Sequence, residues 1–200
     1  MTRDEAYQIL TTYLTNPNLI KHCLAAETVM KTLYRRLNPQ PYDILAEEKW
    51  GITGLLHDAD YQLSKGNPEI HGLLICEKQP LIPPDIAYAI KSHNFENTKI
   101  EPISLMDWSI YCADQLTGLI VAATLVRPDP PSSETSAGQG KMLATVTSEF
   151  ILEKFNDNSF AKGANREAIK MCELKLGIPL PEFILITLTA MQSISSTLGL

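Results

Sequence analysis

The sequence predicts an all-α fold, a helical bundle with a C-terminal helical extension. Apolar residues recur every three or four positions along most of the chain, which is the spacing of a buried helix face. Strand-like alternation and internal repeats are not evident. We expect one domain over residues 1–200, with a core at about 18–127, a flexible loop at about 128–140 and C-terminal helices at about 141–200.

Two helices are expected early in the chain. The first is marked by a stripe whose members step by four, three, four, three and four residues: Leu19, Cys23, Ala26, Met30, Leu33 and Leu37. The second is predicted over about 43–57, and its apolar run GLL leads directly into His57 and Asp58. The C-terminal end of this second helix would therefore carry two side chains of the kind that bind metal ions.

Prolines mark two further helix starts. The order Asn67-Pro68-Glu69 is that of an N-cap, a proline at N1 and an acid in the first turn, so we expect a helix with His71 in its opening turn. Backbone N–H groups of that turn would be free to face a ligand. Pro83-Pro84-Asp85 predicts another helix, which ends near His93-Asn94.

Residues 104–127 form the longest helical candidate and are apolar on both sides, which is typical of a central buried helix. Asp114 lies inside this helix. A buried carboxylate without a partner is very costly, and the nearest cations in sequence, Lys99 and Arg127, are not three or four residues away. Asp114 is therefore either a metal ligand or a hydrogen-bonded structural residue that caps another helix.

The helical pattern breaks after this candidate. Residues 127–141 are rich in Pro, Ser and Gly, which predicts an exposed, mobile loop. Two or three helices follow, the last of them beginning at Pro181. The apolar stretch of that last helix, residues 183–191, is far shorter than the roughly 20 residues that span a bilayer. We therefore expect no association with a membrane.

The composition narrows the class of protein. A net charge of −6 argues against a protein that binds a nucleic acid polymer, since such proteins are usually basic. The four cysteines are far apart and lie among apolar neighbours, which predicts a reducing compartment. The N-terminal segment has acidic residues and no long apolar core, unlike a signal peptide. We therefore expect a cytoplasmic location.

All four histidines of the chain belong to one ordered set with two aspartates: His22, His57, Asp58, His71, His93 and Asp114. Successive members are separated by about one helix and one turn, so they can converge in the centre of a bundle. Each histidine alone also has a structural explanation. His22 could be a hydrogen-bonded core residue, His57 and His93 could be cations at helix C-termini, and His71 could lie on the surface.

The set resembles a known family. The order H…HD…H…H…D, with GLLHDAD at 54–60 and YCADQLTGLI at 111–120, closely resembles the HD-domain metal-dependent phosphohydrolase superfamily. It is most similar to the small, stand-alone HDIG-type bacterial members, whose C-terminal segment residues 158–183 also resemble. The chain departs from that pattern at 59–61, where Ala-Asp-Tyr replaces Ile-Gly.

The resemblance implies an HD-domain bundle around one or two divalent ions. The first ion would be held by His22, His57, Asp58 and Asp114, and the second by His71 and His93, with Asp58 bridging. Imidazoles and carboxylates suit Mn, Fe, Ni, Co or Zn, with Mg as a further candidate. The resemblance further implies hydrolysis of a phosphomonoester or phosphodiester, such as a nucleotide, by a metal-bound hydroxide, with His57 and Asp58 as the catalytic residues.

The expected partner is a small phosphorylated substrate. Lys65, in a predicted loop, and Arg166 are candidates to bind its phosphate, Arg166 because a guanidinium can do so in bidentate fashion. Lys162, Arg166 and Lys170 also step by four and could simply be a solvated basic face. Asp60 would either orient a ligand histidine or cap the following turn.

Two other functions remain open at the level of sequence. HD-fold proteins that hold two irons and activate oxygen have an overlapping ligand set, so a di-iron oxygenase is one alternative. A non-catalytic module that binds metal and nucleotide is the other. The intact set of six candidate ligands argues against the second alternative, because a site without chemistry has no need of all six.

Overall fold

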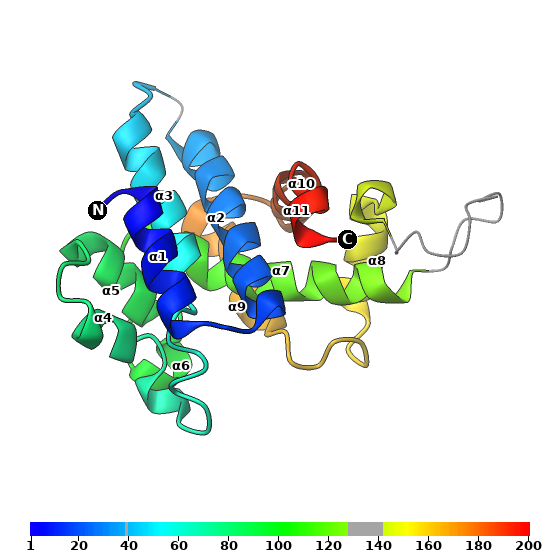
Figure 1. The fold of residues 1–200 in the computed structure, drawn as a ribbon. Coiled ribbons are helices and arrows are strands. Elements are labelled where there is room, and N and C mark those ends of the chain that lie inside the picture. The colour runs from blue at the N-terminus through cyan, green and yellow to red at the C-terminus, as the bar shows by residue number, and fades with distance from the viewer. Residues whose placement is uncertain (39, 128–141) are drawn as a thin grey trace.

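The computed structural model describes residues 1–38, 40–127 and 142–200, and these residues are all helical or irregular, without a strand (Figure 1). The prediction of an all-α fold is therefore confirmed. Residues 128–141 lie outside the described part, and with them the predicted loop. The α-helices are α1 (Arg3–Tyr13), α2 (Pro17–Leu37), α3 (Ile44–Leu56), α4 (Leu74–Lys78), α5 (Pro84–Ser92), α6 (Phe95–Thr98), α7 (Leu105–Val126), α8 (Ser148–Asn156), α9 (Arg166–Leu176), α10 (Leu180–Gln192) and α11 (Ser195–Leu198).

The long helices begin where the sequence supplies caps. The side chain of Asn16 accepts a hydrogen bond from the N–H of Asn18, and Pro17 follows at the first helical position of α2. Asp43 caps α3 in the same way, and Ser104 opens α7 with a capping box. These caps explain why the predicted boundaries of α3 and α7 agree with the structure to within a residue or two. The predicted boundaries of α5 agree as well, although that helix begins at Pro84 without a side-chain cap.

The helices α2, α3 and α7 form the centre of the molecule. In Figure 1, α2 and α3 lie side by side and α7 passes across them, while α8, α10 and α11 lie toward the other end of α7. Gly54 permits the close approach of α2 and α3, because a Cβ atom there would be 2.5 Å from the carbonyl oxygen of Ala26. The two helices therefore meet backbone to backbone just before α3 ends at Leu56 and the chain reaches His57.

Two apolar clusters make up the core. The larger joins α2 to α7, α8, α9 and α10, and the smaller joins α1, α3, α4 and α5 to the N-terminal part of α2. On α2, Cys23 belongs to the smaller cluster and Ala26 to the larger. The first turns of α2 therefore lie where the two clusters meet, and His22 is on one of those turns.

The prediction that a helix starts at Asn67 is wrong. Only a single 3₁₀ turn, Pro68–Ile70, forms there, and Asn67 makes no capping hydrogen bond. His71 has an extended backbone with φ −67° and ψ 128°. The reason is a distant carboxylate, because Asp60 accepts the N–H groups of Gly72 and Ile75 and turns the chain around itself. In the turn after Asn67 itself, the N–H groups of Ile70 and His71 donate to the carbonyls of Asn67 and Pro68, so these N–H groups are not free to face a ligand.

The C-terminal end also differs in part. The helix predicted to start at Pro181 is α10, which starts one residue earlier, at Leu180. It is not the last helix, because the chain bends after Gln192 and forms the short helix α11. The C-terminal helices thus comprise α8 to α11 within the described part of the chain.

In the described part of the chain, one helix is long and apolar enough to cross a membrane by length and composition. This is α7, and 61% of its most apolar 18-residue window is buried inside the fold, as is common for the core helix of a soluble protein. The pair α9 and α10 would pass the same criterion together, but the two helices are bent by 106°. The apolar character of α7 is therefore explained by its central position.

Candidate metal centre

The six predicted ligands converge into two neighbouring groups. His22, His57, Asp58 and Asp114 each offer a ligand atom within 4.8 Å of the others, and Asp58, His71 and His93 do the same. Asp58 is common to both groups. Residues from α2, α7, the ends of α3 and α5 and the turn around His71 thus meet at one place, although 92 residues separate the first from the last.

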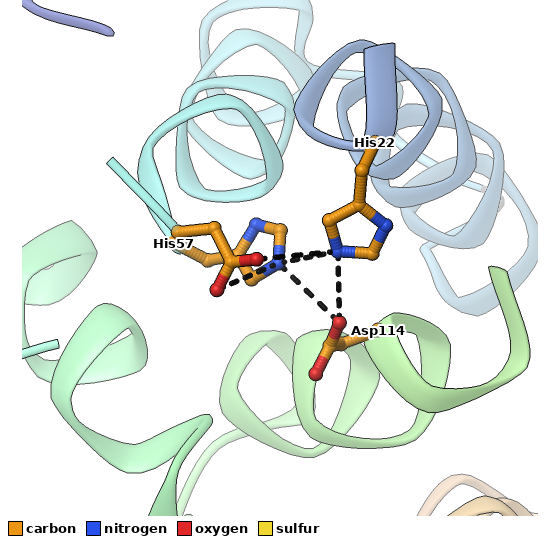
Figure 2. A group of neighbouring side chains, drawn as sticks. His22, His57 and Asp114 are labelled. Atoms are coloured by element: carbon orange, nitrogen blue, oxygen red, sulfur yellow. Dashed lines mark hydrogen bonds and ion pairs between the residues drawn. The ribbon is translucent and has the colours of Figure 1, made fainter. Parts of the chain in front are cut away.

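The first group joins α2, α3 and α7. His22 points down from α2, His57 points across from the end of α3 and Asp114 points up from α7, so that their polar ends face one another (Figure 2). His22 Nε2 lies 2.9 Å from Asp114 Oδ1 and 3.2 Å from His57 Nε2. His57 Nε2 lies 3.5 Å from Asp114 Oδ1. Both histidines therefore present the same nitrogen, Nε2, to the centre of the group.

The second group lies on the other side of Asp58. The Oδ2 atom of Asp58 is 3.5 Å from His22 Nε2, whereas its Oδ1 atom is 3.0 Å from His71 Nε2. His93 Nε2 lies 3.6 Å from the same Oδ1 atom and 3.1 Å from His71 Nε2. Asp58 is thus placed to share its two oxygens between the groups.

Backbone carbonyls fix the orientation of two histidines. The Nδ1–H of His57 donates to the carbonyl of Gly54 at 2.8 Å, and the Nδ1–H of His93 donates to the carbonyl of Ile90 at 2.5 Å. A carbonyl can only accept, so Nδ1 carries the proton in each ring. In the neutral imidazole, Nε2 then bears the lone pair that a metal ion requires.

A carboxylate fixes His71. Its Nδ1–H donates to Asp60 Oδ1 at 2.8 Å, and Asp60 is fully buried. Asp60 also accepts the N–H groups of Gly72 and Ile75. Burial opposes the charge on Asp60, but these hydrogen bonds outweigh it and lower the pKa of its carboxyl. Asp60 thus has both of the roles expected for it, because it orients a histidine and binds the N–H groups of the following turn.

A hydroxyl completes the pattern at His22. Thr117 Oγ1 donates its hydrogen to the carbonyl of Asp114 at 2.7 Å, which leaves its lone pairs to accept from His22 Nδ1 at 3.4 Å. Gln115 in turn donates to Asp114 Oδ2 at 2.8 Å. Thr117 and Gln115 were not among the residues predicted from the sequence to take part in the site. Their closeness to Asp114, as polar residues in an otherwise apolar helix, was the available signal.

The carboxylates of Asp58 and Asp114 have different partners from that of Glu47. Glu47, which is also buried, is neutralised by a bidentate contact with the guanidinium of Arg35 at 2.6 and 2.8 Å. Within the described residues, no Lys or Arg nitrogen lies within 4 Å of Asp58 or Asp114. Their negative charge is balanced only by histidines, which leaves room for a cation.

Protons hold the site together when no metal ion is bound. Burial opposes protonation of His57, but Asp58 and Asp114 outweigh burial and raise the pKa of His57 to about 9. Likewise, Asp58 and Asp60 overcome burial and raise the pKa of His71 to about 10. Burial also works against ionisation of Asp58 and Asp114, but the histidines lower the pKa of both carboxyls.

The donor set fits divalent transition-metal ions. Two pairs of Nε2 atoms approach to 3.2 and 3.1 Å, one in each group. Two lone pairs at that separation repel each other unless a proton or a cation lies between them. Four imidazole nitrogens and two carboxylates are ligands that Mn, Fe, Co, Ni and Zn accept. The residues present therefore suit one ion in each group.

Three cavities have a candidate ligand in their walls. One, which we name the His71 cavity, has a volume of about 390 Å³ and is lined by residues that include Asn16, Leu19, Tyr61, Lys65 and His71. The second, the His22 cavity, has a volume of about 370 Å³ and is lined by His22, Asp114, Gln115, Gly118 and residues 161, 163 and 164. The third has a volume of about 430 Å³ and is lined by Lys21, His22 and mainly apolar residues of α2, α7 and the segment 198–200. Lys65, a predicted substrate-binding residue, thus shares a cavity with a candidate ligand.

Arg166, the other predicted substrate-binding residue, has a different environment. Its guanidinium donates to the carbonyls of Ala161 at 2.6 Å, Ala164 at 2.9 Å and Phe160 at 2.5 Å. It lines none of the three cavities. Because Ala161 and Ala164 line the His22 cavity, Arg166 supports the wall of that cavity rather than facing it.

Comparison of the chain with models of protein families, with curated proteins and with solved structures found no match. What the site does must therefore follow from the identity and placement of its own donor atoms. These are four imidazoles and two carboxylates, arranged in two groups that meet at Asp58.

Proposed function

We propose that the protein is a metal-dependent phosphohydrolase that cleaves a phosphomonoester or phosphodiester bond of a small molecule. The observation that carries the proposal is the pair of ligand groups that share Asp58. Two cation sites bridged by a carboxylate are the arrangement expected of a centre that clamps phosphate. The resemblance of the ligand order to the HD-domain phosphohydrolases supports the same function.

Each group would hold one ion. His22, His57 and Asp114 would bind the first, His71 and His93 the second, and Asp58 would contact both. The chemistry that such ions supply is the activation of water and the neutralisation of charge on phosphate. The ions would be Mn, Fe, Ni, Co or Zn, with Mg a weaker candidate because nitrogen ligands predominate.

The chain itself contributes rigidity and a low dielectric environment. Hydrogen bonds from Nδ1 hold the rings of His57, His71 and His93 before any ligand arrives. Leu55 and Leu56, next to His57, are fully buried and keep water away from one side of the centre. Charges in such surroundings interact more strongly than they would in water.

The location proposed is the cytoplasm. All four cysteines are unpaired, as is usual in a reducing compartment. The substrates would then be small phosphorylated metabolites, and neither a nucleic acid polymer nor a membrane is proposed as a partner.

Phosphate release by purified protein tests the function. Protein prepared without chelator is assayed with a panel of phosphorylated compounds and with Mn, Fe, Ni, Co and Mg in turn. We expect metal-dependent release of phosphate or of a phosphorylated product, and loss of release in His57→Ala and Asp58→Ala. Asp85→Ala is the control, because Asp85 is an aspartate on the surface that pairs with Lys49.

Two results would contradict the proposal. One is activity that persists in both His57→Ala and Asp58→Ala. The other is oxygen consumption that depends on iron, without hydrolysis of any phosphorylated compound, which would identify a di-iron oxygenase. Binding of metal and nucleotide without turnover would instead identify a regulatory module.

A further inference from the structure

The cavities at the metal centre differ in charge. Among the described residues, Lys65 is the only Lys or Arg residue that lines the His71 cavity, and none lines the His22 cavity, whose wall includes the carboxylate of Asp114. Lys21 lines the third cavity, whose other walls are mainly apolar. Among the described residues, Lys65 makes no hydrogen bond or ion pair, so its ammonium group is available to a ligand. An anionic substrate is therefore favoured in the His71 cavity over the His22 cavity, and the polar wall of the His71 cavity suits a phosphate better than the apolar wall of the third.

The His71 cavity is held in shape before a ligand enters. Gln62 Oε1 accepts the N–H groups of Thr15 and Asn16 at 2.6 and 3.1 Å, which ties the turn after α3 to the start of α2. The N–H of Ser64 donates to the carbonyl of Asp60 at 2.9 Å, which fixes the turn that carries Lys65. The N-terminus of α2 adds the positive end of its dipole to this side of the centre.

We propose that the substrate is a phosphomonoester and that it enters through the His71 cavity, with Lys65 as the residue that determines this specificity. The inference rests on the proposed function. A monoester phosphate has three terminal oxygens and close to two negative charges, whereas a diester has two terminal oxygens and one charge. Two ions can neutralise two terminal oxygens, and the ammonium of Lys65 is available for the third.

The cavity also limits the organic part of the substrate. Its volume of about 390 Å³ is at the small end of ligand pockets. Tyr61, which is half exposed, has its ring at 87° to that of His71 and lines the same cavity.

In the reaction, water forms a new P–O bond and the ester P–O bond breaks. One proton of the water goes to the released alcohol, and the other stays on the phosphate.

Lys65→Met is the first test, with Lys65→Arg and Lys162→Met beside it. Lys162 is an exposed lysine in the segment that lines the His22 cavity, so a change in KM with Lys162→Met would indicate that the substrate enters through the His22 cavity. Metal-loaded proteins are assayed with p-nitrophenyl phosphate and bis(p-nitrophenyl) phosphate. For the monoester, Lys65→Met should raise KM about tenfold with kcat nearly unchanged, whereas Lys65→Arg and Lys162→Met should leave KM near the wild-type value.

The ratio of the two substrates gives the second readout. The wild type should prefer the monoester in kcat/KM, and Lys65→Met should reduce that preference about tenfold because the diester does not need Lys65. A preference for the diester in the wild type would overturn the inference. A rise in KM with Lys162→Met rather than Lys65→Met would do so as well.

Binding of inorganic phosphate separates this inference from the proposed function. Calorimetric titration of the metal-loaded protein with phosphate requires no turnover. Lys65→Met should weaken phosphate binding about tenfold, at unchanged metal content. If no substrate is hydrolysed but this loss is observed, the proposed function fails and the Lys65 site stands. If phosphate binds the wild type and Lys65→Met equally, or binds neither, the Lys65 site is wrong.

Discussion

The buried carboxylate of Asp60 accepts the Nδ1–H of His71 at 2.8 Å and so turns the opposite nitrogen of that ring toward Asp58. The same carboxylate accepts the N–H groups of Gly72 and Ile75, which makes it part of the backbone turn as well. Gly72 has φ +84°, and a Cβ atom there would lie 2.8 Å from the carbonyl of Ile90. The turn and the orientation of His71 thus depend on each other.

Substitution of Asp60 should affect one ion of the two. In Asp60→Asn the side chain keeps its shape and can still accept backbone N–H groups, but the charge that orients His71 is lost. We expect affinity for the ion of the His71 and His93 group to fall about 10- to 100-fold, with the other ion retained. Titration with Zn or Mn under calorimetry, together with elemental analysis, measures both sites.

Asp107→Asn is the matched control for this change. Asp107 is a buried aspartate that accepts the N–H groups of Ile103 and Ser104 at the start of α7, away from the ligand groups. Asp107→Asn should lower the stability of the fold without altering metal binding. Two ions bound by Asp60→Asn with the affinity of the wild type would show that His71 needs no such orientation.

The stability of the metal-free protein should fall at alkaline pH. The pKa of His57 is about 9 and that of His71 about 10 in the folded chain, against 6.5 for an ordinary histidine. Their protonation therefore stabilises the fold fully below about pH 6.5, and this stabilisation disappears as the pH rises through 9 and 10. Thermal unfolding in the presence of a chelator, from pH 6.5 to 10, should show a decreasing Tm.

The stabilisation of the fold by bound metal ions should increase with pH. A ligand histidine must be deprotonated, so metal ions bind more tightly as the pH rises. The increase in Tm caused by Zn or Mn should therefore be larger at pH 8.5 than at pH 6.5. A metal-free protein whose Tm rises across this range would show that the protons do not hold the site as described.

Two glycines should respond oppositely to alanine. Gly54→Ala puts a Cβ atom 2.5 Å from the carbonyl of Ala26, which forces α2 and α3 apart and should destabilise the fold by about 1–3 kcal/mol. Gly118, exposed within α7, has open space around its Cβ position, so Gly118→Ala should stabilise the fold by about 0.5–1 kcal/mol. Urea unfolding of both variants decides this, and the reverse order of midpoints would contradict the close contact of α2 with α3.

Arg166→Ala should loosen the wall of the His22 cavity. The loss of charged hydrogen bonds to the carbonyls of Phe160, Ala161 and Ala164 should reduce stability by about 2 kcal/mol. Hydrogen exchange should become faster in residues 157–164, with metal content unchanged. Lys170→Ala, which removes only an exposed pair with Glu167, is the control. Unchanged exchange together with a raised KM would instead favour the direct phosphate contact expected from the sequence.

The sequence predicted those features that depend on nearby residues. Helix starts at Asp43 and Ser104 could be predicted because each cap binds N–H groups two or three residues away. The start expected at Asn67 failed because Asp60, with partners 12 and 15 residues away, determines the backbone there. Non-local hydrogen bonds of this kind leave no periodic signal.

In the candidate site, too, features set by nearby residues could be predicted from the sequence and features set by distant partners could not. Its six ligands could be proposed because their order and spacing follow the succession of helices. Thr117 was missed because its partner, His22, is 95 residues away in sequence. Arg166 was assigned to phosphate because a guanidinium suits phosphate, but five backbone hydrogen bonds occupy it in the structure. Residue type alone could not distinguish these two uses.

Anomalous diffraction from crystals soaked in Mn or Zn would locate the ions directly. Two peaks about 3.5–4 Å apart are predicted, one beside His22, His57 and Asp114 and the other beside His71 and His93, with Asp58 between them. Asp58→Asn crystals should lose at least one of the two peaks. An absence of peaks among these residues in the wild type, at metal concentrations that saturate binding in solution, would contradict the metal centre.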